Sequence, residues 1–114
     1  MKPKILLKFT NKGIYCIPGD FYIDPWLPVS KALITHGHAD HARWGMGTYL
    51  CHEHTVPILK SRIGADISVQ GISYGQSIQI QDVKVSFHPA GHILGSTQIR
   101  MVVCGILFLC RRFE

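Results

Sequence analysis

The sequence lacks any long hydrophobic run. Its longest apolar stretch, residues 101–110, is interrupted by Gly105, and a membrane-spanning helix needs roughly 20 such residues. The basic start of the chain is not followed by the apolar stretch of a secretory signal. We therefore expect no membrane partner and a cytoplasmic protein.

Acidic residues are also scarce, with 7 Asp and Glu against 12 Lys and Arg, which gives a formal net charge of +5. A basic chain suits a polyanionic partner, although a solvated basic surface explains the scattered Lys and Arg equally well. None of the four cysteines forms a C-x-x-C pair, so we expect reduced thiols that pack in the core. With 46% hydrophobic residues and no repeats, residues 1–114 are expected to form one small globular domain.

Short runs of β-branched and aromatic residues, separated by Gly, Pro and Asn, predict a strand-rich α+β fold. One helix is expected over residues 56–62, with Thr55 as its N-cap and Pro57 in its first turn. The pattern leaves room for a second short helix after Asp40. Strands are expected at residues 5–9, 14–17, 21–23, 31–35, 48–51, 67–69, 77–80, 83–88, 97–103 and 106–109.

The densest cluster of chemically reactive side chains follows the apolar strand predicted at residues 31–35. His36, His38, Asp40 and His41 lie within six positions. Alternation along an extended chain places the first two histidines on the same side, and the other two residues follow as the chain turns. Imidazole and carboxylate groups are good ligands for Zn²⁺. The cluster therefore predicts ligands for two adjacent metal ions.

A second loop offers a further ligand. His92 lies between Gly91 and Gly95, which allow the loop to bend sharply. Taken alone, such a histidine is more often structural than a metal ligand. Beside the first cluster, it becomes a natural third ligand for the ion held by His36 and His38.

Asp24 ends an apolar strand shortly before the histidine cluster. Its carboxylate could accept hydrogen bonds from the ligand loop or from a ligand histidine and so fix the orientation of the ring. A strand-ending turn aspartate explains the composition equally well. We interpret His88 as a core or supporting residue, and the residues 52–54, His-Glu-His, as a loop before the helix rather than as a metal site.

These motifs resemble a known family. The residues 35–41, Thr-His-Gly-His-Ala-Asp-His, resemble the H-x-H-x-D-H signature of metallo-β-lactamase-fold hydrolases, and Asp24 resembles the aspartate before it. The residues 89–96, Pro-Ala-Gly-His-Ile-Leu-Gly-Ser, resemble the third motif of the nuclease branch, the β-CASP group. From about Leu6 to Met101 the order of motifs is most similar to the ligase-associated DNA exonucleases, bacterial relatives of RNA 3′-end processing nucleases.

The resemblance implies a metallo-β-lactamase-like αββα sandwich and a two-zinc phosphodiesterase that processes or repairs DNA, with Mn²⁺ as an alternative ion. His36, His38 and His92 would hold one ion. Asp40 and His41 would hold the second, with Asp40 as a catalytic carboxylate and Asp24 as a supporting residue behind the ligands. The expected partners are nucleic acid, DNA rather than RNA, and an ATP-dependent DNA ligase.

The sequence departs from the family after residue 103. The family continues into a strand that ends in a bridging aspartate, and residues 105–114 contain no aspartate. The later histidine ligand and the β-CASP insertion are absent too. We therefore expect the N-terminal half of the sandwich alone, with an exposed apolar sheet face and weak or no activity. The alternatives are a thioester-type hydrolase of the same superfamily and a non-catalytic metal-binding remnant.

Overall fold

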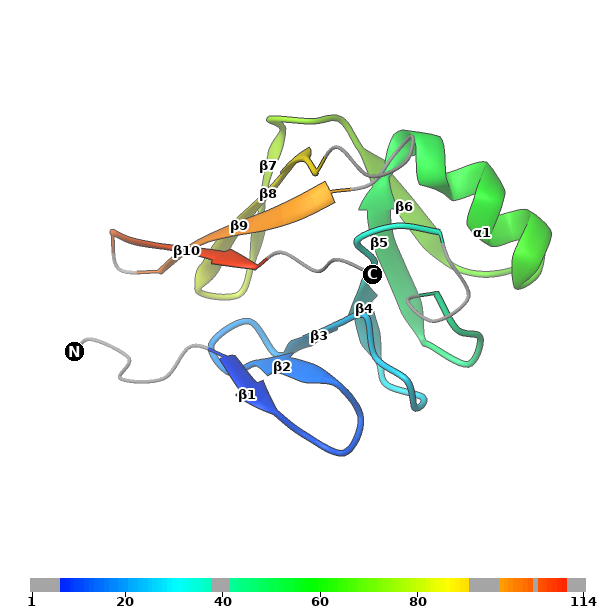
Figure 1. Cartoon of the computed structure of the whole chain (residues 1–114), viewed down its shortest axis with the longest axis horizontal. Coiled ribbons are helices and arrows are strands. Elements are labelled where there is room, and N and C mark those ends of the chain that lie inside the picture. Colours follow the sequence, from blue (N-terminus) through cyan, green and yellow to red (C-terminus); the bar gives the residue numbers. More distant parts are fainter. Residues whose placement is uncertain (1–6, 38–41, 91–96, 104, 111–114) are drawn as a thin grey trace.

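In a computed structural model, the described part of the chain forms two β-sheets and one α-helix (Figure 1). The structure describes residues 7–37, 42–90, 97–103 and 105–110, with the backbone alone for residues 106 and 108–110. In this part of the chain, no helix is long and apolar enough to cross a membrane.

The first sheet contains six strands in sequence order. Its first three strands are antiparallel, and from β3 to β6 each strand pairs in parallel with the next. Parallel neighbours place their carboxyl ends at one edge of the sheet, which is where the candidate site lies. The strands are β1 (Leu7–Phe9), β2 (Ile14–Cys16), β3 (Phe21–Ile23), β4 (Lys31–Leu33), β5 (Thr48–His52) and β6 (Val69–Ile72).

The second sheet contains four antiparallel strands in the order β10-β9-β8-β7. Its longest strands, β8 and β9, pair from Lys84 opposite Val102 to Pro89 opposite Thr97. The strands are β7 (Ser77–Ile80), β8 (Val83–Pro89), β9 (Thr97–Val103) and β10 (Ile106–Cys110).

The main hydrophobic core lies between the two sheets. The first sheet contributes seven buried residues, among them Phe21 and Leu33, and the second contributes another seven, among them Phe87 and Met101. Alternation along each strand turns these side chains inward. The two sheets therefore form a β-sandwich within this chain.

The opposite face of the first sheet is covered by the helix α1 (Val56–Arg62), which lies beside β5 and β6 in Figure 1. Leu59 of this helix packs with Ala32, Ile34, Tyr49 and Cys51 in a second buried cluster. The described layers are thus helix, sheet and sheet.

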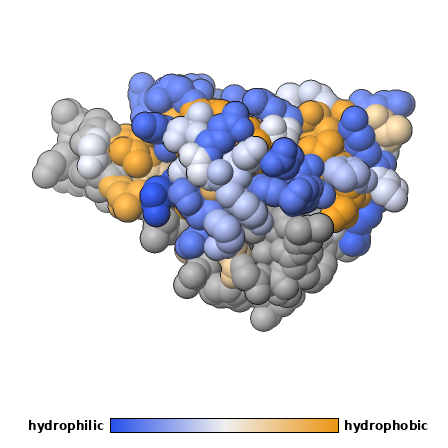
Figure 2. Space-filling model, turned by 90° about the horizontal axis from the view of Figure 1, so that it is seen from above, coloured by the Kyte–Doolittle hydropathy of each residue, from blue (hydrophilic) through white to orange (hydrophobic). Residues whose placement is uncertain are grey.

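The expected exposed apolar sheet face is found only in part among the described residues. Leu107 of β10 lies on the outer face of the second sheet, opposite Val102, and is 51% exposed. The outer face of the second sheet carries polar side chains on neighbouring strands: Gln79 lies opposite Lys84, and Ser86 lies opposite Arg100. In Figure 2, hydrophilic side chains are interspersed with smaller hydrophobic areas on the face seen from above. The face that has no helix over it is therefore compatible with water.

The strands predicted at residues 21–23, 77–80 and 97–103 and the helix at residues 56–62 are confirmed to the residue. Thr55 precedes the helix but makes no side-chain capping bond, because it ends a 3₁₀ turn, η1 (Glu53–Thr55), that His52 caps instead. No helix forms over residues 42–47 of the described chain, so the second helix is not found there. The strand expected at residues 67–69 lies instead at Val69–Ile72, where it pairs with β5.

Candidate metal centre

The candidate site forms at the carboxyl ends of β3 and β4. These strands are parallel neighbours, with Ile23 opposite Leu33. Asp24 follows the first strand directly, and its backbone amide donates a hydrogen bond to the carbonyl oxygen of Leu33 at 2.9 Å. Thr35 and His36 follow the second strand, so the sheet itself brings an aspartate from one segment beside the start of the histidine motif.

A chain of hydrogen bonds runs from Asp24 to His36. Oδ1 of Asp24 accepts from the backbone amide of Thr35 at 2.8 Å, and Oδ2 accepts from the Thr35 hydroxyl at 2.5 Å. Oγ1 of Thr35 lies 3.2 Å from Nδ1 of His36. A hydroxyl has one proton, and the Thr35 proton is already directed at the carboxylate. Nδ1 of His36 must therefore donate, which leaves the lone pair of the imidazole on Nε2.

The three residues joined by these hydrogen bonds are buried: Asp24 and Thr35 are 0% exposed and His36 is 1% exposed. Asp24 has a φ of +46°, in the left-handed region that aspartate tolerates better than most residues. The two hydrogen bonds fix the Asp24 carboxylate against Thr35, the residue before His36. Its role behind metal ligands stays a prediction.

The segment that follows residues 91–96 is bound to the same edge. The backbone amide of Thr97, the first residue of β9, donates a hydrogen bond to the carbonyl oxygen of Thr35 at 2.7 Å. The hydroxyl of Thr97 donates to the carbonyl oxygen of His88 or of Gln98, at 3.0 and 2.9 Å. The residue after positions 91–96 therefore lies next to the residue before His36.

Four of the predicted ligands, His38, Asp40, His41 and His92, lie outside the described residues. Within the described residues, no group of three His, Cys, Asp or Glu side chains could hold a metal ion. The fit to a metal is therefore tested at His36 alone. Its Nδ1 faces the Thr35 hydroxyl and its Nε2 is buried, which is the tautomer that a histidine with Nε2 as the ligand atom requires.

The packing of the helix explains why a glycine stands at position 37. A Cβ at this position would lie 2.7 Å from Cγ2 of Ile58 on α1, which is too close for two carbon atoms. The helix therefore presses against the histidine motif, and only glycine leaves room for it.

The other histidines have local structural partners. The His52 ring stacks on Tyr74 with centroids 3.8 Å apart, and its Nδ1 accepts a hydrogen bond from the backbone amide of His54 at 3.1 Å. Glu53 accepts a hydrogen bond from the Ser73 hydroxyl at 2.9 Å. These contacts support the structural interpretation of residues 52–54.

His88 is half-buried, and its Nε2 lies 2.8 Å from Oγ of Ser86. Burial and then the charge of Arg100 lower the pKa of His88 below its ordinary value. Both effects favour the neutral ring, in keeping with a supporting residue of the second sheet.

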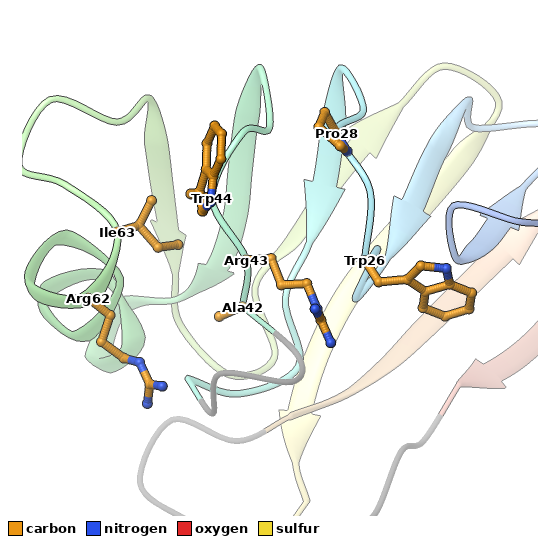
Figure 3. A pocket seen from close by; sticks show the side chains of 7 residues that line it. All are labelled: Trp26, Pro28, Ala42, Arg43, Trp44, Arg62 and Ile63. Carbon is orange, nitrogen blue, oxygen red and sulfur yellow. The ribbon is translucent and has the colours of Figure 1, made fainter.

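Sequence reasoning missed a pocket beside the histidine motif. It has a volume of about 390 Å³ and is shown in Figure 3. Its signal in the sequence was the Arg-Trp pair that comes directly after His-Ala, next to the histidine motif. The pocket is lined by Trp26, Pro28, Ala42, Arg43, Trp44, Arg62 and Ile63.

No protein-family model matches the sequence. A protein of Opitutus terrae named a probable DNA ligase is 31% identical over 93 residues, which is 81% of this chain and 9% of that protein. The chain thus spans about a tenth of the length of the curated relative.

Solved structures share the arrangement of the elements. A B3 metallo-β-lactamase with an active-site glutamic acid matches 90% of this chain and 53% of its own length, with a TM-score of 0.58 and 16% identity. The flavodiiron protein from Giardia intestinalis matches 69% of this chain and 22% of its own length, with a TM-score of 0.56 and 19% identity. A protein of unknown function from Enterococcus faecalis V583 has a TM-score of 0.58 over 69% of this chain and 23% of its own, at 15% identity.

The metallo-β-lactamase match extends over 90% of this chain, whose described residues form ten strands and one α-helix. Since these identities are low, the likeness concerns the fold. The chain has part of the metallo-β-lactamase fold, in an α+β arrangement.

Proposed function

We propose that this chain carries metal-ligand residues of a metal-dependent phosphodiester hydrolase that acts on DNA. The observation that carries the proposal is the buried hydrogen-bond chain from Asp24 through Thr35 to His36. These hydrogen bonds fix one tautomer of the His36 ring and leave its lone pair on Nε2. A buried histidine prepared in this way, at the start of an H-x-H-x-D-H motif, is suited to bind a metal ion.

In this proposal His36, His38 and His92 hold one ion, and Asp40 and His41 hold a second, with Zn²⁺ preferred and Mn²⁺ as the alternative. Zinc, when bound, supplies an acidified water and a positive counter-charge for phosphate oxygens. Asp24 is a positioning residue, since it acts on His36 through the Thr35 hydroxyl. The hydrogen bond between Thr97 and Thr35 supports the proposal because it binds the strand after the His92 segment to the start of the motif.

Two observations support DNA as the substrate. The similar stretch of 93 residues belongs to a protein named a probable DNA ligase. A nuclease that trims DNA ends would prepare them for joining by such an enzyme. The net charge of +5 favours a polyanionic substrate. We extend the proposal to an association with an ATP-dependent DNA ligase.

The first test measures zinc bound to the purified chain by elemental analysis. A His36→Ala variant should retain less zinc than the unaltered chain, because it loses a ligand whose orientation the fold has already fixed. His54→Ala is the matched control, since His54 is an exposed histidine and should not affect zinc. Equal zinc in all three proteins would contradict the proposal.

The second test measures the release of nucleotides from end-labelled DNA with added Zn²⁺ or Mn²⁺. Hydrolysis by this chain should be weak or absent, and any that is found should depend on the metal and should disappear in His36→Ala while it persists in His54→Ala. Hydrolysis that is unchanged in His36→Ala would point to a contaminating nuclease. Zinc binding together with hydrolysis of a thioester but not of DNA would favour the other hydrolase class.

A further inference from the structure

We propose that the pocket between Trp26, Arg43, Trp44 and Arg62 binds a single-stranded segment of DNA. In this arrangement an unpaired base stacks on Trp44, and the two guanidinium groups contact backbone phosphates. The choice of DNA as the nucleic acid rests on the proposed function, whereas the pocket itself is an independent feature of the described structure.

Two exposed indole rings suit the stacking of bases. Trp44 is 76% exposed and Trp26 is 40% exposed, although large aromatic side chains are normally mostly buried. Aromatic faces that remain in water are the usual platforms for unpaired bases in proteins that bind single strands. An exposed Trp pair that lines one pocket therefore has a ready ligand class.

Hydrogen bonds fix the backbone segments that carry both rings. Nε1 of Trp26 donates a hydrogen bond to the carbonyl oxygen of Asn11 at 2.7 Å, and its backbone amide donates to the carbonyl oxygen of Lys12 at 2.8 Å. The segment that carries Trp44 is bound through Tyr49, whose hydroxyl donates to the carbonyl oxygen of Arg43 at 2.6 Å. A fixed backbone lowers the entropy cost of binding.

The charge of the pocket complements phosphate. Among the described residues that line it, two are arginines and none is acidic. In Figure 3, Arg43 lies between the two indole rings, and the guanidinium groups of Arg43 and Arg62 extend in the same direction from two different elements. Arginine is well suited to phosphate because its planar group donates two parallel hydrogen bonds.

The shape of the pocket favours a single strand over a duplex. A volume of about 390 Å³ falls within the range of about 300–1,000 Å³ that is typical of pockets for small ligands. A base inside a duplex is stacked and paired, so its faces cannot reach an indole ring. Arg43 follows His41 by two positions in the sequence, so a strand in this pocket would lie beside the segment that carries the histidine motif.

The test measures binding of the full chain to a fluorescein-labelled oligothymidylate of about 12 nucleotides, a length within the range of known single-strand sites. EDTA is present throughout, so that neither metal binding nor cleavage is required. Fluorescence anisotropy gives the affinity. The sequence contains two tryptophans, Trp26 and Trp44, so quenching of intrinsic fluorescence on binding reports directly on the pocket.

Trp44→Ala should weaken binding by on the order of 10-fold or more, the loss expected for one stacked base, and Trp44→Phe should restore most of it. Replacing Arg43 or Arg62 with alanine should reduce the slope of log affinity against log salt by about 0.7 for each phosphate that the variant no longer neutralises. Phe9→Ala and Arg100→Ala are the matched controls, because both side chains are exposed and neither lines the pocket. They should leave binding unchanged.

Three results would overturn the inference: equal affinity of Trp44→Ala and the unaltered chain, tighter binding of duplex than of single-stranded DNA, or tighter binding of oligouridylate. Circular dichroism of each variant establishes that its fold is retained. Trp44-dependent binding in EDTA by a chain that neither retains zinc nor cleaves DNA would support this inference while the proposed function fails. Metal-dependent cleavage, together with DNA binding that does not change in Trp44→Ala, would support the proposed function and contradict this inference.

Discussion

The backbone amide of Thr97 lies 2.7 Å from the carbonyl oxygen of Thr35, to which it donates a hydrogen bond. Thr97 begins a strand of the second sheet, and Thr35 follows a strand of the first. The bond therefore joins the two sheets beside both candidate ligand segments. Thr35 directly precedes the histidine motif, and Thr97 directly follows residues 91–96.

We predict that Thr35→Val lowers both the affinity for zinc and the stability of the fold. Valine has nearly the shape of threonine, but it removes the hydroxyl between Oδ2 of Asp24 and Nδ1 of His36. Removal of such a supporting hydrogen bond typically lowers metal affinity about 10- to 100-fold, and a buried group left without its partner costs about 1–3 kcal/mol. Competition with a zinc chelator and urea unfolding measure the two effects. Thr10→Val, a hydroxyl outside the site, is the control, and unchanged zinc affinity in Thr35→Val would contradict the role of the hydrogen-bond chain.

Gly37→Ala should destabilise the fold and disturb the histidine motif, because its new Cβ would lie 2.7 Å from Cγ2 of Ile58. Overpacking of this kind costs about 1–3 kcal/mol. Ile58→Ala should relieve the clash, so that the double variant is more stable than the two single changes together predict. Urea unfolding of all four proteins measures the coupling, and strictly additive effects would show that the helix does not press on Gly37.

His52 should make stability depend on pH. Burial, followed by the charge of His54, lowers the pKa of His52 below its ordinary value, and Glu53 opposes the shift. A lowered folded-state pKa means that the unfolded chain binds more protons. The contribution of His52 is therefore fully present above the unfolded pKa of about 6.5 and is lost as the pH falls below that value and through the lower folded-state pKa.

The variant His52→Asn isolates this effect, because asparagine can still accept the hydrogen bond that His52 accepts from the amide of His54. It should be less stable than the unaltered chain at neutral pH, since it loses the stacking on Tyr74. It should also lose less stability on acidification. Thermal unfolding in EDTA from about pH 7.5 to about pH 5 makes the comparison, and parallel pH profiles would exclude His52 as the titrating group.

Tyr49→Phe should loosen the segment that carries Trp44. The Tyr49 hydroxyl donates to the carbonyl oxygen of Arg43 at 2.6 Å and accepts from the amide of Met46 at 3.4 Å. The two bonds hold a stretch without regular secondary structure, so their loss should cost about 1–2 kcal/mol and should increase proteolytic cleavage after Arg43. Tyr22→Phe, on β3, serves as the control, and equal cleavage rates in the two variants would contradict this assignment.

The sequence predicted those elements that depend on local pattern. Strand β9 and the helix α1 begin and end where alternation and a proline in the first turn placed them. The fourth strand of the parallel series was misplaced because Gly71, which usually interrupts strands, lies inside it. Here the backbone of Glu53 and the side chain of Val56 leave no room for a Cβ, a tertiary constraint that no local pattern reveals.

The candidate site was predictable in its residues but not in its connections. Asp24 and His36 stood out by type and position, whereas the role of Thr35 as the link between them depends on two parallel strands ending side by side. The pocket of Trp26 and Arg62 was missed for a similar reason. These residues come from separate parts of the chain, and the fold alone brings them together.

The hydrogen bond between Thr97 and Thr35 also bears on the order of folding. Its two residues are far apart in the sequence, and contacts of this kind form slowly because a long loop must close first. The first sheet, built from near neighbours in sequence, can form early, whereas the edge that carries the candidate centre is complete only after the second sheet docks. A ligand that bridges both segments would therefore stabilise the docked state of the whole chain and slow its unfolding, rather than ordering a single loop.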